Sequence, residues 1–186
     1  EKALGLRKGS MLVASTGVIG VPLPLAKVEN GVGPLVSSLS ADGLHDATEA
    51  IMTTDAFPKK SALKVRIGGV QVRMAGIAKG AGMICPNMAT MLAFFVTDAN
   101  IKSKTLGRAL KEAVDGSFNS IIVDNDTSTN DTVLAFANGL SKGAEIKHGT
   151  KEYGSFVNAL TRLSTGLAHL IVKDGEGATR FVEIDI

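Results

Sequence analysis

A threonine between a glycine-rich segment and an apolar segment is the residue of this sequence best suited to covalent chemistry. It lies in the tetrapeptide Asn87-Met88-Ala89-Thr90. In an intact chain, such a threonine is only a residue that favours strands. If the Ala89–Thr90 bond is cut, however, the new N-terminal residue carries a hydroxyl nucleophile and an amine base together. An α-amine titrates near about 7.7–8.0, so it can act as a general base at cellular pH without any histidine.

Other residue types that often carry catalysis or bind metals do not form a recognised site. None of His45, His148 and His169 has a second histidine three or four positions away, so a metal site is not expected. The loop at 124–131, DNDTSTND, begins like a calcium loop but lacks the required glycine and the final glutamate. A run of Asx and Ser/Thr turns is therefore the preferred interpretation of this loop.

The segment at 76–87, GIAKGAGMICPN, has three glycines and one lysine and cannot be regular structure throughout. It could hold a phosphate, but its glycine spacing matches neither a Walker loop nor a dinucleotide fingerprint. The alternative is a loop whose glycines allow positive φ or close packing. Cys85 in this segment could be a nucleophile, but a lone cysteine without a neighbouring histidine is more often a small core residue.

Composition restricts the class of protein that can carry this chemistry. A chain of 186 residues forms one domain of ordinary size or two small lobes. Hydrophobic residues make up 45% and charged residues 20%, which provides for a buried core and excludes a disordered chain. Twenty basic against 18 acidic residues give a net charge of +2 without a charged block, so nucleic acid is not an expected partner.

The sequence also favours a soluble, intracellular protein. It has no 18-residue apolar run and no secretory leader, so no membrane association is expected. Its single cysteine excludes an internal disulfide scaffold. Because the chain begins at Glu1 without a methionine and ends on an apolar alternation, we expect it to be part of a longer protein.

The elements that must position these residues follow from hydrophobic spacing. Period-two or short apolar runs predict strands at 11–15, 63–67, 70–74, 90–96, 120–123, 132–137 and 179–186. Helical spacing predicts helices at 43–54, from Ser103 as the N-cap to about Phe118, and at 153–171 with its end at Lys173 and Gly175. Gly68-Gly69 between two alternating runs indicates an antiparallel hairpin. The predicted class is α/β, with helices layered on a mixed, partly antiparallel sheet.

Five segments, in order along nearly the whole chain, resemble the ornithine acetyltransferase (glutamate N-acetyltransferase) family of arginine biosynthesis. The longest is KGAGMICPNMATMLAFFVTDA around Thr90, which is similar to the self-cleaving junction of that family. The others are STGVIG at 15–20, TTDAFPK at 53–59, DNDTSTNDT at 124–132 and KDGEGATRF at 173–181. The resemblance implies a fold of the self-processing N-terminal-threonine acyltransferase type.

The resemblance assigns roles to particular residues. It implies autocatalytic cleavage at Ala89–Thr90, with Thr90 as the nucleophile and a substrate-binding residue. It implies that Thr16 and Gly17 form the oxyanion hole, which suits a tight turn after a predicted strand. Further substrate-binding positions correspond to Lys79, Glu176 and one of the pair Thr53 and Thr54. A basic group suits the carboxylate of an amino-acid substrate, and an acidic group suits its amine.

The implied activity is transfer of an acetyl group from N-acetylornithine to glutamate through an acetyl-Thr90 ester. Residues 1–89 would form an α-chain portion and residues 90–186 a β-chain portion, associated as one catalytic unit in a higher oligomer in the cytoplasm. No cofactor or metal is implied, although acetyl-CoA is an open second donor. Two alternatives remain open: a self-processing N-terminal-threonine amidohydrolase or aminopeptidase, and a non-catalytic module that binds a small ligand at 76–82.

Overall fold

The computed structural model describes residues 1–85 and 91–184. Ala89 and Thr90, the two residues of the predicted cleavage site, lie outside the described residues. The segments on either side of them are described: one ends at Cys85, and the other begins at Met91.

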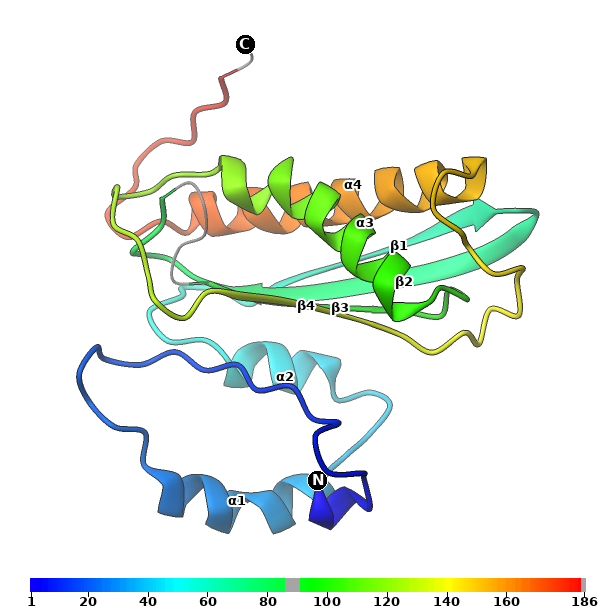
Figure 1. Ribbon diagram of the computed structural model, residues 1–186. Coiled ribbons are helices and arrows are strands. Elements are labelled where there is room, and N and C mark those ends of the chain that lie inside the picture. The colour runs from blue at the N-terminus through cyan, green and yellow to red at the C-terminus, as the bar shows by residue number, and fades with distance from the viewer. Residues whose placement is uncertain (86–90, 185–186) are drawn as a thin grey trace.

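A four-stranded mixed sheet forms the centre of the molecule (Figure 1). Its strands are β1 (Lys59–Ile67), β2 (Val70–Lys79), β3 (Leu92–Thr97) and β4 (Thr132–Ala137), in the order β1-β2-β3-β4. The pairs β1–β2 and β2–β3 are antiparallel, whereas β3 and β4 are parallel. The predicted mixed, partly antiparallel sheet is therefore confirmed.

The predicted hairpin is present and longer than the alternating runs alone indicated. β1 and β2 pair from Lys59↔Ala78 to Ile67↔Val70. Gly68 and Gly69 connect them with φ angles of +55° and +82°. A two-residue turn with two positive φ angles matches the right-handed twist of the strands, and glycine adopts it without a steric penalty.

Two helices cover one face of this sheet: α3 (Ser103–Asp115), which lies between β3 and β4 in sequence, and α4 (Lys151–Lys173) (Figure 1). Apolar residues at helical spacing on α4 form much of the core; they are Tyr153, Phe156, Leu160, Leu163, Leu167 and Ile171. Both predicted helices are confirmed. The N-cap of α3 is Lys102 rather than Ser103, and Ser103 is the first residue of the helix.

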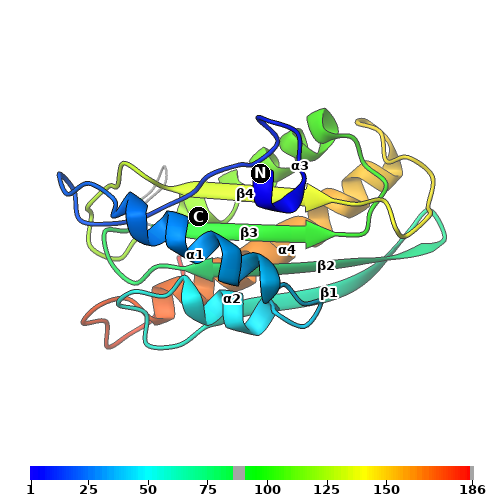
Figure 2. The ribbon, with the colours of Figure 1, turned by 90° about the horizontal axis from the view of Figure 1, so that it is seen from below.

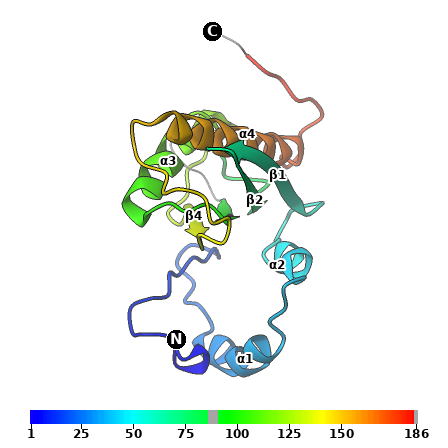
Figure 3. The ribbon, with the colours of Figure 1, turned by 90° about the vertical axis from the view of Figure 1, so that its right-hand side faces the viewer.

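The N-terminal segment lies on the opposite side of the sheet. It contains α1 (Leu25–Ser37), which was not predicted from the sequence, and α2 (Leu44–Ala50), which falls within the predicted helix at 43–54. Figures 1 and 3 show α2 next to the sheet and α1 farther from it, and Figure 2 shows both helices in front of the strands. The molecule is therefore layered, with helices on both sides of one sheet.

Three predicted strands were wrong. Residues 11–15 and 179–184 are irregular, as is 121–123, while Phe118–Ser120 form a 3-10 helix. Residues 185–186, the end of the last predicted strand, lie outside the described residues. An apolar run becomes a strand only if a neighbouring strand satisfies its backbone hydrogen bonds. Within the described part of the chain, no strand pairs with these runs.

Candidate active site

A cavity of about 510 Å³ lies at the end of β2 where Lys79 is the last residue. Segments far apart in sequence line it: Thr16, Gly17, Val18, Ile19, Thr53, Lys79, Met83, Ser128, Thr129 and Asn130. Four of the predicted site residues, Thr16, Gly17, Thr53 and Lys79, thus share one cavity. A larger cavity of about 960 Å³ lies beside Leu63, Met74 and Val96, and none of the predicted site residues lines it.

Lys79 is a buried cation at the floor of the site. The residue is 3% exposed, and its Nζ donates a hydrogen bond to Thr53 Oγ1 at 3.0 Å. Burial lowers the pKa of Lys79, and Lys59 adds to this effect, while Asp55 and Asp131 oppose it. An ammonium group has three donors. It can therefore bind an anionic oxygen that enters the cavity while keeping its bond to Thr53.

Thr53 is held by both its backbone and its side chain. Its N–H donates to Asp55 Oδ2 at 3.1 Å, and its hydroxyl accepts the bond from Lys79. The sequence left Thr53 and Thr54 as alternatives. Thr53 lines the cavity, whereas Thr54 is not among the described residues that line it. The geometry favours Thr53 as the threonine that can contact a ligand beside Lys79.

Thr16 and Gly17 enter the site from the N-terminal segment. The side-chain amide of Asn130 donates to the carbonyl of Ser15 at 3.1 Å and ties this segment to the loop at 124–131. That loop contains the expected turns, in which the side chains of Asp124 and Ser128 accept bonds from backbone N–H groups two residues later. It also lines the cavity, a role that turn chemistry alone did not reveal.

Glu176 lies beside the loop that follows Lys79. Its N–H donates to the carbonyl of Ala81 at 2.7 Å. A Cβ atom added to Gly82 would lie 3.0 Å from the carboxyl carbon of Glu176, so a side chain at position 82 would push the carboxylate away. Glu176 is exposed and does not line the cavity as the structure describes it. Through the bond to Ala81, which is two residues after Lys79, the backbone of Glu176 lies against the segment that follows Lys79.

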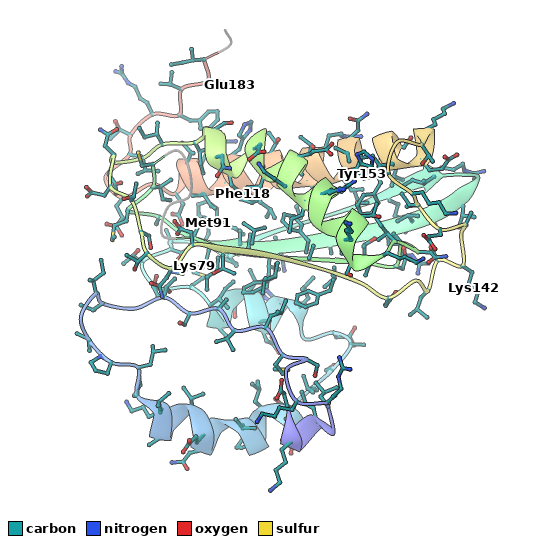
Figure 4. The ribbon with its side chains drawn as sticks, viewed as in Figure 1. Lys79, Met91, Phe118, Lys142, Tyr153 and Glu183 are labelled. Carbon is teal, nitrogen blue, oxygen red and sulfur yellow. The ribbon has the colours of Figure 1, made fainter. Side chains whose placement is uncertain are left out.

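Met91, the first described residue after the predicted cleavage site, is fixed on both sides. Its N–H donates to Asp131 Oδ1 at 2.8 Å, and its carbonyl accepts from Thr132 N at 3.2 Å. Burial raises the pKa of Asp131, although the bond from Met91 and the charge of Lys79 both act to lower it. Its Oδ2 is buried without a hydrogen-bond partner among the described residues. Figure 4 shows Met91 and Lys79 at the same end of the sheet.

The segment before the predicted junction is fixed by another aspartate. The carboxylate of Asp124 accepts bonds from Met83 N at 2.6 Å and Ile84 N at 2.8 Å. Cys85, which follows, is half-buried, and its role as a small core residue stays a prediction. Both sides of the predicted junction are thus held by carboxylates of the loop at 124–131, which the sequence could show only as a polar turn region.

Residues 1–85 and 91–184 contain neither a cluster of metal ligands nor a membrane-spanning helix. No group of three or more histidine, cysteine, aspartate or glutamate residues is arranged to hold a metal ion in that part of the chain. None of the helices described there is long and apolar enough to cross a membrane.

Comparison with families of known proteins matches residues 1–186, the whole chain, to the ArgJ family. The chain belongs to the ArgJ family. It is 52% identical over 185 residues to the "Arginine biosynthesis bifunctional protein ArgJ" of Symbiobacterium thermophilum. It is 51% identical over 191 residues to the mitochondrial protein of that name from Podospora anserina. The resemblance inferred from the five sequence motifs is therefore confirmed.

This ArgJ-family chain spans about half the length of the curated relatives that it matches, 46% of the Symbiobacterium protein and 41% of the Podospora protein. Among solved structures, it is similar to the crystal structure of arginine biosynthesis bifunctional protein argJ from Bacillus halodurans. That match has 41% identity and a TM-score of 0.45, and it covers 47% of this chain and 41% of the other. The family assignment depends on the sequence match and not on this partial overlap.

Proposed function

We propose that the protein is an acetyltransferase that moves an acetyl group from N-acetylornithine to glutamate through an acetyl-Thr90 ester. Membership of the ArgJ family over the whole chain supports an acetyl-transfer role in arginine biosynthesis. The structural observation that carries the proposal is the cavity shared by Thr16, Gly17, Thr53 and Lys79. The cavity brings together three separate segments of the chain. They carry groups that could stabilise an oxyanion and bind a substrate carboxylate.

The proposed reaction begins with cleavage of the chain. The Thr90 hydroxyl attacks the carbonyl carbon of Ala89, so that a C–O bond forms, the peptide C–N bond breaks, and the Thr90 amine takes a proton. Water then hydrolyses the resulting ester and leaves a carboxylate on Ala89 and a free amine on Thr90. Hydrogen-bond donors such as those proposed at Thr16 and Gly17 stabilise the negative charge that develops on the attacked oxygen.

Acetyl transfer then follows in two half-reactions. The Thr90 hydroxyl, deprotonated by its own amine, attacks the acetyl carbonyl of N-acetylornithine, and that proton passes to the departing ornithine amine. The neutral amine of glutamate attacks the acetyl ester next, so that a C–N bond forms and the ester C–O bond breaks. A proton from that amine passes through the Thr90 amine to the Thr90 oxygen, which restores the hydroxyl as N-acetylglutamate leaves. Because these steps balance with the threonine and the two amino acids alone, they require neither a metal nor a redox cofactor.

The charged groups at the site suit an amino-acid substrate. In the proposed complex, Lys79 binds the α-carboxylate of the substrate, and Glu176 binds an ammonium group. The bond between Lys79 Nζ and Thr53 Oγ1 supports this role, because it fixes the direction of the ammonium and brings a hydroxyl beside it. Of the pair Thr53 and Thr54, Thr53 is the residue that we propose to bind the substrate together with Lys79.

Pairing across the predicted junction supports a single catalytic unit made of residues 1–89 and 90–186. β2 precedes the junction and β3 follows it, and they pair from Met74↔Thr97 to Lys79↔Leu92. α4 of the second portion also covers β1 and β2 of the first (Figure 1). We therefore propose that the α and β chains stay associated after cleavage, while the higher oligomer and the cytoplasmic location stay predictions.

A product assay tests this function. Purified protein is incubated with N-acetylornithine, with and without glutamate, and the acetylated products are measured. We expect N-acetylglutamate and ornithine in equal amounts with glutamate present, and little free acetate without it. Release of acetate regardless of glutamate would instead support the amidohydrolase alternative. Because the relatives are named bifunctional, a parallel reaction with acetyl-CoA as the donor tests for a second activity.

The oxyanion role of Thr16 predicts a loss of turnover when its hydroxyl is removed. Loss of one oxyanion donor typically lowers turnover by about 10²–10³-fold. We expect Thr16→Ala to lower kcat by that order with little change in KM, whereas Thr16→Ser, which keeps a hydroxyl, stays close to the unaltered protein. Equal turnover for Thr16→Ala would limit the oxyanion role to backbone N–H groups.

A further inference from the structure

Lys59, at the start of β1, is a completely buried cation that the proposed reaction does not use. Its side chain is 0% exposed. Its Nζ donates to Asp55 Oδ1 at 2.7 Å and to Asp174 Oδ2, and the carbonyl of Phe57 lies at 3.4 Å. Both carboxylates are almost fully buried as well. All three donors of the ammonium group therefore face acceptors inside the protein.

The two carboxylates bound to Lys59 hold backbone groups of the site. Asp55 Oδ1 accepts from Gly80 N at 2.7 Å, and Asp55 Oδ2 accepts from Thr53 N at 3.1 Å. Asp174 Oδ2 accepts from Ala56 N at 2.9 Å. One ammonium thus fixes two carboxylates, and these fix the loop of Thr53 and the residue directly after Lys79.

A third segment joins the same network at the end of α4. Asp174 is the C-cap residue of α4 and lies two positions before Glu176. Glu176 N in turn donates to Ala81 O at 2.7 Å. The network of Lys59, Asp55 and Asp174 therefore connects the segments 53–57, 80–82 and 174–176. Each segment contains, or directly follows, one of the predicted substrate-binding residues.

Stability alone does not account for this network. Moving a lysine and two carboxylates out of water is costly, and apolar residues of similar volume are often as stabilising as a buried ion pair. The negative end of the α4 dipole favours a cation near Asp174, but an exposed lysine would provide that as well. What a buried ammonium adds is a fixed direction for the hydrogen bonds that converge on the three loops.

We propose that Lys59 is a positioning residue for the amino-acid substrate, acting through Asp55 and Asp174 on the segments of Thr53, Lys79 and Glu176. This inference rests on the proposed function of the site. Misplacement of binding groups by about 1 Å can cost about 10²-fold in rate, even when the altered residue does not touch the substrate. Lys59 thus acts on substrate use through geometry and not through contact.

A double-mutant cycle tests this role. Lys59→Met, Glu176→Gln and the double variant are compared for kcat and KM with N-acetylornithine, with Lys64→Met, an exposed lysine of the same strand, as the control. We expect Lys59→Met to lower kcat/KM by about 10–10²-fold, mainly through KM, and Lys64→Met to have no effect. In the Glu176→Gln background, Lys59→Met should have less effect than in the unaltered protein, because the part of its effect that passes through Glu176 is already lost.

Asp174→Asn provides a second route if Lys59→Met does not fold. The amide can still accept from Ala56 N but no longer offers a charge to Lys59, and we expect the same rise in KM. If Glu176→Gln is impaired but the effect of Lys59→Met is absent, or simply adds to that of Glu176→Gln, the positioning role of Lys59 is overturned. The proposed function of the site would then still stand. Normal kinetics of Glu176→Gln would instead contradict the proposed function of that residue. If neither Lys59→Met nor Asp174→Asn folds, the role of Lys59 is in folding, and the inference is overturned.

Discussion

Thr90→Ala is expected to leave the chain in one piece and without acetyltransferase activity. The substitution removes the hydroxyl that must attack both the Ala89 carbonyl and the acetyl group, so both reactions fail for one reason. Removal of a covalent nucleophile has cost on the order of 10⁶-fold in turnover in a serine hydrolase. Denaturing electrophoresis and intact mass measure the cleavage, and the product assay measures the transfer.

Thr90→Ser is the matched control, because it keeps a hydroxyl and the capacity for an N-terminal amine. We expect it to be cleaved and to retain activity. The bonds from Met91 to Asp131 and Thr132 do not involve the side chain of residue 90, so neither substitution should disturb the start of β3. A Thr90→Ala chain that still separates into two fragments at Ala89 would contradict the mechanism.

Glu176→Gln is expected to impair use of N-acetylornithine while leaving cleavage at Ala89–Thr90 intact. A hydrogen bond to a charged group contributes about 1.5–3 kcal/mol, which corresponds to roughly a 10–10²-fold fall in kcat/KM. Cleavage continues because it needs no bound substrate. Glutamine has nearly the same volume as glutamate, so it fits the same space beside Gly82, where a Cβ atom would come within 3.0 Å of the Glu176 carboxyl carbon. Steady-state kinetics on the cleaved protein measure the effect.

Glu183→Gln provides a control for the loss of one negative charge. Figure 4 shows Glu183 on the C-terminal segment, away from Lys79. We expect its kinetics to equal those of the unaltered protein. If the kinetics of Glu176→Gln also equal those of the unaltered protein, Glu176 is an exposed loop residue that takes no part in binding.

Much of the fold could be predicted from local patterns. The alternation on either side of Gly68-Gly69 predicts β1 and β2, and the apolar spacing from Tyr153 to Ile171 predicts α4, because one face of each element is buried. The run at 11–15 is equally apolar but has no partner strand among the described residues. Local sequence cannot show whether such a partner exists. α1, with two glycines and an internal proline, lacks a strong helical signal.

The site could be predicted only as far as its residue types. The family motifs point to Lys79 and to one of the pair Thr53 and Thr54 as separate positions, but not to the bond between Lys79 and Thr53. The network of Lys59 depends on Asp174, which is 115 positions away, and a buried lysine has the same sequence signal as an exposed one. Asp131 likewise appears in sequence as a turn residue, whereas in the structure it holds the start of β3.

The mass of the intact protein, before and after addition of N-acetylornithine without glutamate, tests the central claim most directly. The account predicts two chains that divide at Ala89–Thr90, with the mass of one acetyl group added to the chain that begins at Thr90. Glutamate should then remove this acetyl group. An uncleaved chain that gains no mass would contradict the account and support a module that only binds a small ligand.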